Sequence, residues 1–183
     1  CQSSQIRCGI ARATSFEGNP MNDQANTAEI APDQPLECMM IPIKAQTLLV
    51  PMVSVAEMAL VAPIFPDNSG PDWFLGYYSW RNGRVPLVSF EKLNGESVAG
   101  INPNGRIAVF NSTGVDPEVP FIAIPTQGIP RNITVSQEDI LGFNTATHLY
   151  EVMHVRVGVE ELVIPDITGI QKAYCAYKNT RRL

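Results

Sequence analysis

The sequence predicts an all-β fold, either a barrel or a sandwich built from short strands. Roughly eight to ten short apolar or alternating segments follow one another, and turn-forming residues separate them at intervals of roughly 8–12 residues. Few segments have helical periodicity. The long strand–helix–strand units of a parallel nucleotide-binding sheet are missing from the pattern.

Order is expected to begin near Met39. The segment 39–54 is apolar with partial alternation and contains Pro42 and Pro51. Because proline has no backbone N–H to donate, the strands of this segment are expected at a sheet edge or next to a bulge.

The next segment predicts a short helix. Ser54 and Glu57 fit a capping box. Apolar residues then recur at helical spacing: Val55, Met58, Ala59 and Ala62. A loop dense in turn-forming residues follows at 63–71.

A hairpin is predicted in the middle of the chain. Residues 73–80 show no clean alternation, and four of these eight residues are Trp or Tyr. Asn82-Gly83 predicts a type I′ turn, which needs positive φ at both central residues. The chain resumes a strand at 85–90, and residues 91–95 predict a short helical turn.

The rest of the chain predicts further strands and a final helix. Strands are expected at 106–110, 120–125, 131–136, 151–157 and 159–165. The second of these is expected to be half-buried, because Ile122 and Ile124 alternate with Ala123. One helical turn is expected at 136–139, and 141–149 has no readable pattern.

Asp166 is expected to cap the final helix. Its apolar side would comprise Ile167, Ile170, Tyr174 and Tyr177. Gly169 should weaken this helix by about 1 kcal/mol relative to Ala.

Composition restricts the class of protein. The 183 residues, 45% of them apolar, suit one domain or two small lobes with a common core. A net charge of −5 argues against nucleic-acid binding. No apolar run approaches the roughly 18 residues that span a bilayer, so a soluble protein without membrane insertion is expected. Residues 1–38 are expected to be a disordered leader, with 1–20 upstream or cloning-derived and Met21 the true start.

No metal or cofactor site is predicted. The cysteines are scattered and form no C-x-x-C pair: Cys1, Cys8, Cys38 and Cys175. With His148 and His154 as the only histidines, the spacing of a zinc site is absent. Scattered cysteines of this kind are typical of free thiols in a reducing compartment, and a cytoplasmic location is expected.

Signals of catalysis are weak. The chain has no glycine-rich phosphate loop, nucleophile elbow or His-Glu-x-x-His motif. Asp166-Ile-Thr-Gly differs from the Asp-Thr-Gly of aspartic proteases by an inserted Ile and has no second copy, so a helix cap explains it better. A small β-barrel hydrolase using His148 or His154 is one alternative function. A ligand-binding barrel, which needs a cavity of several hundred Å³, is another.

The densest group of aromatic and basic residues lies on the predicted hairpin. It comprises Tyr77, Tyr78, Trp80, Arg81 and Arg84. Such residues are enriched where proteins contact one another. In the alternative interpretation Trp80 and one tyrosine belong to the core and the arginines are only solvated.

The segment 71–90 resembles the signature segment of CheW-like domains. Matching residues fall in register: Pro71, Trp73 or Phe74, Gly76, Arg81, Pro86 and Leu87. The flanking segments 54–64, 106–125, 134–140 and 159–174 also resemble parts of these domains, in the same order. The resemblance therefore extends over about Met39 to Tyr177, and 39–183 is expected to be the CheW-like domain.

The resemblance implies two packed SH3-like five-stranded barrels with short helices. It implies a non-catalytic adaptor, without cofactor or metal, that couples the tip of methyl-accepting chemoreceptors to the regulatory domain of a CheA-type histidine kinase. Arg81 matches an arginine of the family's receptor-contact region. The expected partner-binding residues are Val55, Ser79, Trp80, Arg81, Asn82 and Arg84.

Two departures from the family pattern suggest a divergent paralogue. Asn82 replaces the family glycine after the arginine, and Ser89 replaces the family aspartate after the proline. Asn tolerates positive φ, so the turn should persist. Accessory proteins of pilus chemosensory systems, which control twitching motility, are similar in being short and acidic.

Overall fold

The computed structural model describes residues 34–97, 100–143 and 148–181. The predicted leader, 1–38 with its start at Met21, lies almost wholly outside the described residues, and Leu36 already belongs to the first strand.

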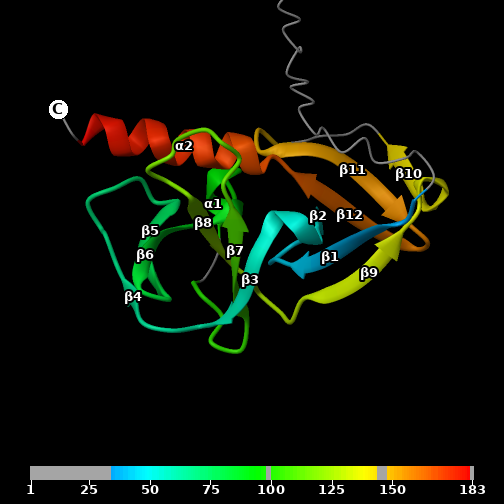
Figure 1. Ribbon diagram of the computed structural model, residues 1–183, viewed down its shortest axis with the longest axis horizontal. Helices are drawn as coiled ribbons and strands as arrows, with labels where there is room; N and C mark the ends of the chain where they lie inside the picture. The colour runs from blue at the N-terminus through cyan, green and yellow to red at the C-terminus, as the bar shows by residue number, and fades with distance from the viewer. Residues whose placement is uncertain (1–33, 98–99, 144–147, 182–183) are drawn as a thin grey trace, which may run out of the picture. The chain divides into compact units, whose positions relative to one another are not determined.

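In the described part of the chain, twelve strands form two six-stranded sheets, so the all-β prediction is confirmed. The first sheet has the order β10 (Ile140–Phe143), β11 (Glu151–Val157), β12 (Glu160–Pro165), β2 (Thr47–Pro51), β1 (Leu36–Pro42) and β9 (Arg131–Val135). The second sheet has the order β3 (Val55–Leu60), β7 (Arg106–Asn111), β8 (Phe121–Pro125), β6 (Gly83–Val88), β5 (Phe74–Trp80) and β4 (Ile64–Phe65). Figure 1 shows the first sheet on the right and the second on the left.

The two sheets share one plan. Each joins two antiparallel groups of three strands through a single parallel pair, β2 with β12 in the first sheet and β6 with β8 in the second. The chain starts the first sheet with β1 and β2, builds the whole second sheet with β3–β8, and then returns to complete the first.

Among the described residues, three apolar clusters hold the sheets together. One belongs to the first sheet alone, a second belongs to the second sheet alone, and a third, the shared cluster, takes residues from both. Strand β7 shows how the sequence achieves this: Ile107 and Val109 enter the second sheet's own cluster, whereas Ala108 and Phe110 enter the shared one. A strand buried on both faces has no polar positions to alternate with, so it reads as a continuous apolar run.

The same burial corrects the expectation for 120–125. Ile122 and Ile124 face the shared cluster and Ala123 the second sheet's cluster, so β8 is buried on both faces rather than half-buried. The segment 73–80 does alternate in burial, with Phe74, Gly76, Tyr78 and Trp80 inside. Aromatic residues on both faces of β5 concealed that period in the sequence.

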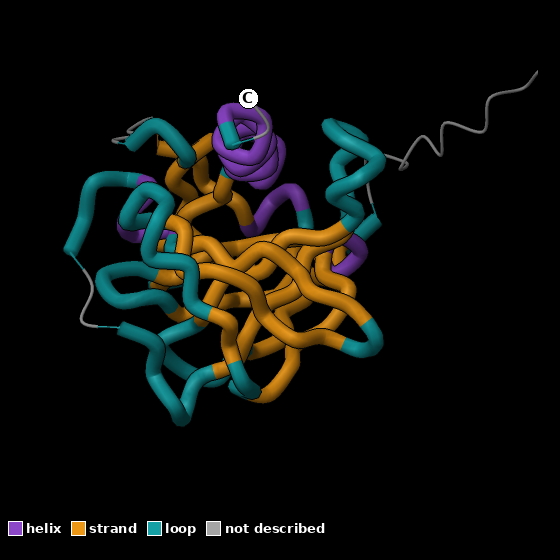
Figure 2. The backbone as a smooth tube through the Cα atoms, turned by 90° about the vertical axis from the view of Figure 1, so that its left-hand side faces the viewer, coloured by secondary structure: helices purple, strands orange, loops and turns teal. Residues whose placement is uncertain are grey.

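The final helix forms as predicted. Helix α2 spans Ile167–Thr180, and the Asp166 carboxylate accepts a hydrogen bond from the Gly169 N–H at 2.8 Å. All four residues of its predicted apolar side belong to the shared cluster or pack against it. The absence of a side chain at Gly169 leaves room for the capping carboxylate of Asp166, because a Cβ at this position would collide with it. Figure 2 views α2 almost end-on, above the strands.

The shorter helices lie close to their predicted positions. Helix α1 (Phe90–Leu93) starts after Ser89, whose side chain accepts a hydrogen bond from the Lys92 N–H. The turn η2 (Gln137–Asp139) carries a capping box between Ser136 and Asp139. A further turn, η1 (Met52–Ser54), precedes β3.

The predicted helix at 54–62 is wrong: residues 55–60 of this segment form strand β3. Its backbone pairs antiparallel with β7, where Met58 is opposite Ala108. The Ser54 hydroxyl caps no helix and donates to the carbonyl of Pro51 at 2.6 Å. The six residues of β3 are too few for a stable isolated helix, so pairing with a buried strand decides their conformation.

The expectation that Pro42 and Pro51 mark edge strands or bulges is also wrong, because β1 pairs with β2 and β9 without a register shift. Strand β1 lies between β2 and β9, and β2 lies between β12 and β1. Each proline is the last residue of its strand, where a missing donor interrupts no continuing ladder. Strands β4 and β10 were not predicted, because β4 is only two residues long and β10 starts where the apolar pattern becomes irregular.

Candidate functional site

The predicted hairpin exists, but its turn lies one residue earlier than expected. Trp80 is opposite Gly83, so Arg81 and Asn82 are the two central residues and Gly83 already belongs to β6. Among the described non-glycine residues only Arg81 has positive φ, at 50°. A type I′ turn on Asn82-Gly83 is therefore wrong. Burial of Tyr78 and Trp80 fixes the register of β5, and this register determines where the turn falls.

Arg81 is held in place by two neighbours. Its guanidinium lies 4.3 Å from the centroid of the Trp80 ring, and its Nη2 lies 3.3 Å from Glu57 Oε2. The same carboxylate oxygen accepts a hydrogen bond from Trp80 Nε1 at 2.9 Å. The Arg81 side chain nevertheless remains 67% exposed. An exposed ion pair of this kind adds little stability, so these contacts orient the guanidinium rather than stabilise the fold.

The hairpin also closes the second sheet. Strands β3 and β5 are not neighbours in the sheet order. Side chains of β5 still reach β3, because Trp80 binds Glu57 and the Tyr78 hydroxyl donates to the carbonyl of Leu60 at 2.7 Å. The sheet therefore curls until β3 and β5 are joined by side chains, and Arg81 sits at the end of this closed structure.

The six expected partner-binding residues are only partly brought together. Ser79, Arg81, Asn82 and Arg84 are exposed on one hairpin. Trp80 belongs to the same hairpin, but it is buried in the second sheet's cluster. Val55 lies on β3 and packs against the shared cluster instead. Sequence reasoning missed Glu57 as a neighbour of Arg81, because the residue was assigned to a helix cap.

A pocket of about 360 Å³ opens beside the turn. It is lined by residues 80–85 of the hairpin and by Pro120 and Phe121 at the start of β8. The rings of Trp80 and Phe121 meet edge to face with centroids 4.7 Å apart. The pocket thus combines an aromatic floor with the exposed side chains of Arg81 and Arg84.

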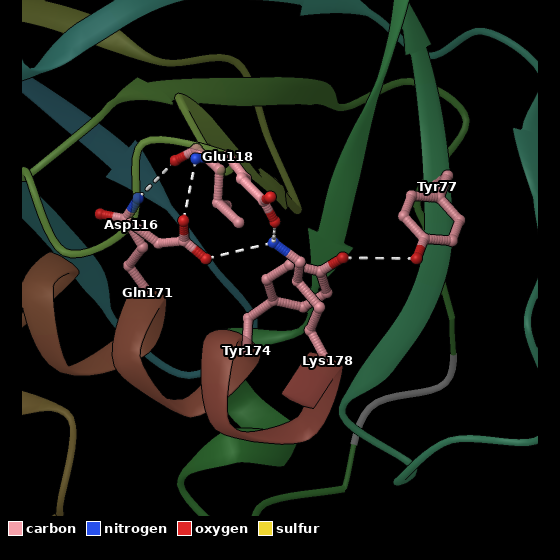
Figure 3. A network of polar contacts seen from close by, with 7 residues as sticks. Tyr77, Asp116, Glu118, Gln171, Tyr174 and Lys178 are labelled. Atoms are coloured by element: carbon pink, nitrogen blue, oxygen red, sulfur yellow. Dashed lines mark hydrogen bonds and ion pairs between the residues drawn. The ribbon is translucent and has the colours of Figure 1, made fainter. Parts of the chain in front are cut away.

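A second pocket of about 170 Å³ lies between the hairpin and α2. Lys178 of α2 contacts Asp116 Oδ2 at 3.1 Å and Glu118 Oε2 at 2.7 Å. The hydroxyl oxygens of Tyr77 and Tyr174 lie 3.3 Å apart. Figure 3 shows these three contacts, with Lys178 between the two carboxylates.

Both histidines of the chain bind one buried carboxylate. Glu151 Oε1 lies 3.1 Å from His148 Nδ1, and Oε2 lies 2.9 Å from His154 Nε2. Gln46 also donates to Oε1 at 2.9 Å. Burial would raise the pKa of Glu151, but the hydrogen bonds from His154, Gln46 and His148 outweigh it and lower the pKa to about 2. These hydrogen bonds to Glu151 connect the β1–β2 turn, which carries Gln46, to the start of β11.

Within the described ranges there is no group of three or more His, Cys, Asp or Glu residues that could hold a metal ion. No helix in this part of the chain is long and apolar enough to cross a membrane. Cys38 and Cys175 are buried free thiols, and burial raises the pKa of both. Cys1 and Cys8 lie outside the described residues.

Comparison with protein-family models decides the family. The model of the CheW-like domain matches residues 37–170. The chain belongs to the CheW-like family. No curated protein sequence matches the chain.

The fold agrees with this membership. The chain is similar to the crystal structure of the scaffolding protein TtCheW from Thermoanaerobacter tengcongensis, with a TM-score of 0.61 and 14% sequence identity. The match covers 72% of this chain and 89% of TtCheW. The two sheets correspond to the two SH3-like barrels expected of a CheW-like protein, with six strands in each sheet rather than five. Membership of a scaffold family makes this chain a chemotaxis scaffold or adaptor.

Proposed function

We propose that this CheW-like protein couples the tip of methyl-accepting chemoreceptors to the regulatory domain of a CheA-type histidine kinase. The exposed Arg81 carries the proposal. It lies beside a pocket with an aromatic floor, and Trp80 and Glu57 orient its guanidinium. A guanidinium offers a planar fork of donors to carboxylates or carbonyl oxygens of a partner.

The contact surface centres on the β5–β6 turn. Ser79, Arg81, Asn82 and Arg84 supply its exposed polar groups. Trp80 is buried and contributes the ring on which the Arg81 guanidinium stacks. Val55 lies on β3, two residues before Glu57, and packs against the shared cluster, so its part in the contact stays a prediction.

A pull-down tests this proposal. The full chain is incubated with the regulatory domain of the host's CheA-type kinase and, separately, with the receptor tip. We expect wild-type protein to be retained, and Arg81→Asp to lose at least one of the two partners while keeping its circular-dichroism spectrum. Arg131→Asp is the matched control, because Arg131 is exposed and paired with Glu160 on the first sheet. Equal retention of wild type and Arg81→Asp by both partners would refute the site.

We further propose that the protein is not an enzyme and works in the cytoplasm. Both histidines are engaged by Glu151, and neither lines the pockets beside the hairpin. The double variant His148→Gln/His154→Gln should therefore bind partners like the wild type at neutral pH. Loss of a hydrolytic activity in this variant would favour the hydrolase alternative instead.

Asn82 and Ser89 depart from the family pattern, and the proposal of an accessory role is based on these departures. Ser89 is 1% exposed, its side chain caps α1 by accepting from the Lys92 N–H, and its hydroxyl donates to Glu91, so it offers no surface charge. We propose a divergent paralogue that serves a pilus chemosensory system. Deletion of the gene should then impair twitching but not swimming, and the opposite phenotype would contradict the assignment.

A further inference from the structure

The pocket between the hairpin and α2 has features that the Arg81 site does not explain. It shares Arg84, Val85, Pro120 and Phe121 with the pocket beside the turn, so the two spaces adjoin. Its remaining polar lining comes from β5, α2 and the loop before β8. The pocket therefore brings together groups that are far apart in the sequence.

Arg84 is the main donor at this pocket. Its guanidinium lies 4.1 Å from the centroid of the Phe65 ring. Within residues 34–97, 100–143 and 148–181 it donates no hydrogen bond to an acceptor and forms no ion pair. Stacking fixes the plane of a guanidinium but leaves the N–H groups at its edge available, and that edge fits a carboxylate.

The two tyrosines supply a second donor. Tyr174 is 4% exposed, and its burial together with Tyr77 raises its pKa, so its hydroxyl stays protonated at neutral pH. The two hydroxyls make one contact with each other, at 3.3 Å. Only one of the two hydroxyl groups can donate its proton in this contact. The other hydroxyl proton has no acceptor among the described residues.

The charges select the ligand. Lys178 already binds the carboxylates of Asp116 and Glu118, which leaves Arg84 as the cation available to a ligand. A ligand that accepts from Arg84 and from a tyrosine hydroxyl carries an oxygen anion, and a pocket of about 170 Å³ takes one side chain rather than a helix.

We propose that this pocket binds the carboxylate of an acidic side chain presented by a protein partner. The source of that side chain rests on the proposed adaptor function, whereas the carboxylate chemistry rests on Arg84 and the tyrosine pair. The partner's adjoining residues would occupy the larger pocket beside Arg81.

A titration followed by NMR tests the proposal without any identified partner. The full protein is titrated with N-acetyl-glutamate amide and, in parallel, with N-acetyl-glutamine amide. We expect the glutamate compound to shift the Arg84 Nε–Hε signal and the Tyr77 and Phe121 amides saturably, and the glutamine compound to bind about tenfold more weakly or less. Equal shifts with both compounds, or none at these groups, would overturn the proposal.

Three variants sharpen the test. Arg84→Gln should weaken binding of the glutamate compound at least about tenfold, and Glu118→Gln should strengthen it by removing a repelling carboxylate. Arg131→Gln, on the first sheet, is the control and should leave binding unchanged. If Arg131→Gln weakens binding as much as Arg84→Gln does, the attraction is not specific to the pocket and the proposal fails.

The titration also separates this proposal from the adaptor function. Suppose that kinase and receptor fail to bind in the pull-down but the glutamate compound still shifts the Arg84 signal saturably. This result would contradict the adaptor function and support the carboxylate site. Partners that bind without any shift at Arg84 would contradict the site alone. If free glutamate binds about tenfold tighter than the capped compound, the ligand of the pocket is a free amino acid. That result would overturn the proposal that a protein partner presents the carboxylate.

Discussion

Glu151 provides the most quantitative expectation for this fold. Its side chain is fully buried, and the bonds from two histidines and Gln46 outweigh the effect of burial and lower its pKa from 4.5 to about 2. At about 1.4 kcal/mol for each tenfold change in proton affinity, this fall corresponds to about 3 kcal/mol of folding free energy. Because the folded-state pKa is the lower one, this stability is complete above pH 4.5 and is lost as the pH falls toward about 2.

The variant Glu151→Gln removes the charge and keeps the shape of the side chain. We expect it to lower the free energy of unfolding by up to about 3 kcal/mol at pH 7. Near pH 2, where the folded-state carboxylate is half protonated, the wild type has lost nearly all of the stability that depends on this charge. The difference in unfolding free energy between variant and wild type should then almost vanish. Urea unfolding followed by tryptophan fluorescence at both pH values measures the two differences.

The control for this experiment is Glu138→Gln. Glu138 is exposed on η2, and its substitution should change the unfolding free energy by less than about 0.5 kcal/mol at either pH. A loss for Glu151→Gln that is equally large at pH 7 and pH 2 would show that packing, not the buried charge, sets its contribution. That result would refute the argument from the histidine contacts.

Three further expectations concern the scaffold. Gly76→Ala should destabilise the protein by at least about 2 kcal/mol in thermal unfolding, because φ is 110° there and a Cβ would collide with the Phe65 carbonyl; an unchanged melting temperature would contradict the close approach of β4 to β5. Asp166→Ala should cost about 1 kcal/mol in urea unfolding through loss of the α2 cap, and a cost near zero would mean that packing alone starts the helix. Tyr78→Phe should cost roughly 1 kcal/mol by removing the hydrogen bond to Leu60, and no loss in the same assay would argue against side-chain closure of β3 onto β5.

Local signals predicted much of the fold. The cap residue Asp166 and the apolar residues after it predicted helix α2. Apolar runs and turn residues predicted the positions of five strands: β7, β8, β9, β11 and β12. These signals are local, because a cap or an apolar run needs no knowledge of the partner element. The resemblance to CheW-like domains added the two-barrel arrangement.

The errors arise where a distant partner decides the conformation. Residues 55–60 have helical spacing, but β7 supplies backbone hydrogen bonds and the segment becomes a strand. The turn on Asn82-Gly83 has the right residues, yet burial of Trp80 shifts it to Arg81. Neither pairing register nor sheet order is written in a short window of sequence.

The candidate site was only partly predictable for the same reason. The sequence predicted that Arg81 and its neighbours share one hairpin, because they are adjacent in the chain, but it placed the turn one residue too late. Their role in binding stays a prediction. It could not place Glu57 against Arg81, or Tyr174 and Lys178 beside Arg84, since these contacts join segments that are 24 residues or more apart. The curl of the second sheet and the packing of α2 create them.

Co-sedimentation of the kinase with receptor particles tests the central claim most directly. Kinase, membranes carrying the receptor tip and this protein are mixed, and the kinase that pellets with the membranes is measured with and without the protein. The adaptor account predicts that the wild-type protein increases the pelleted kinase, and that Arg81→Asp does not while Arg131→Asp does. Kinase that pellets equally with and without the wild-type protein would contradict the account.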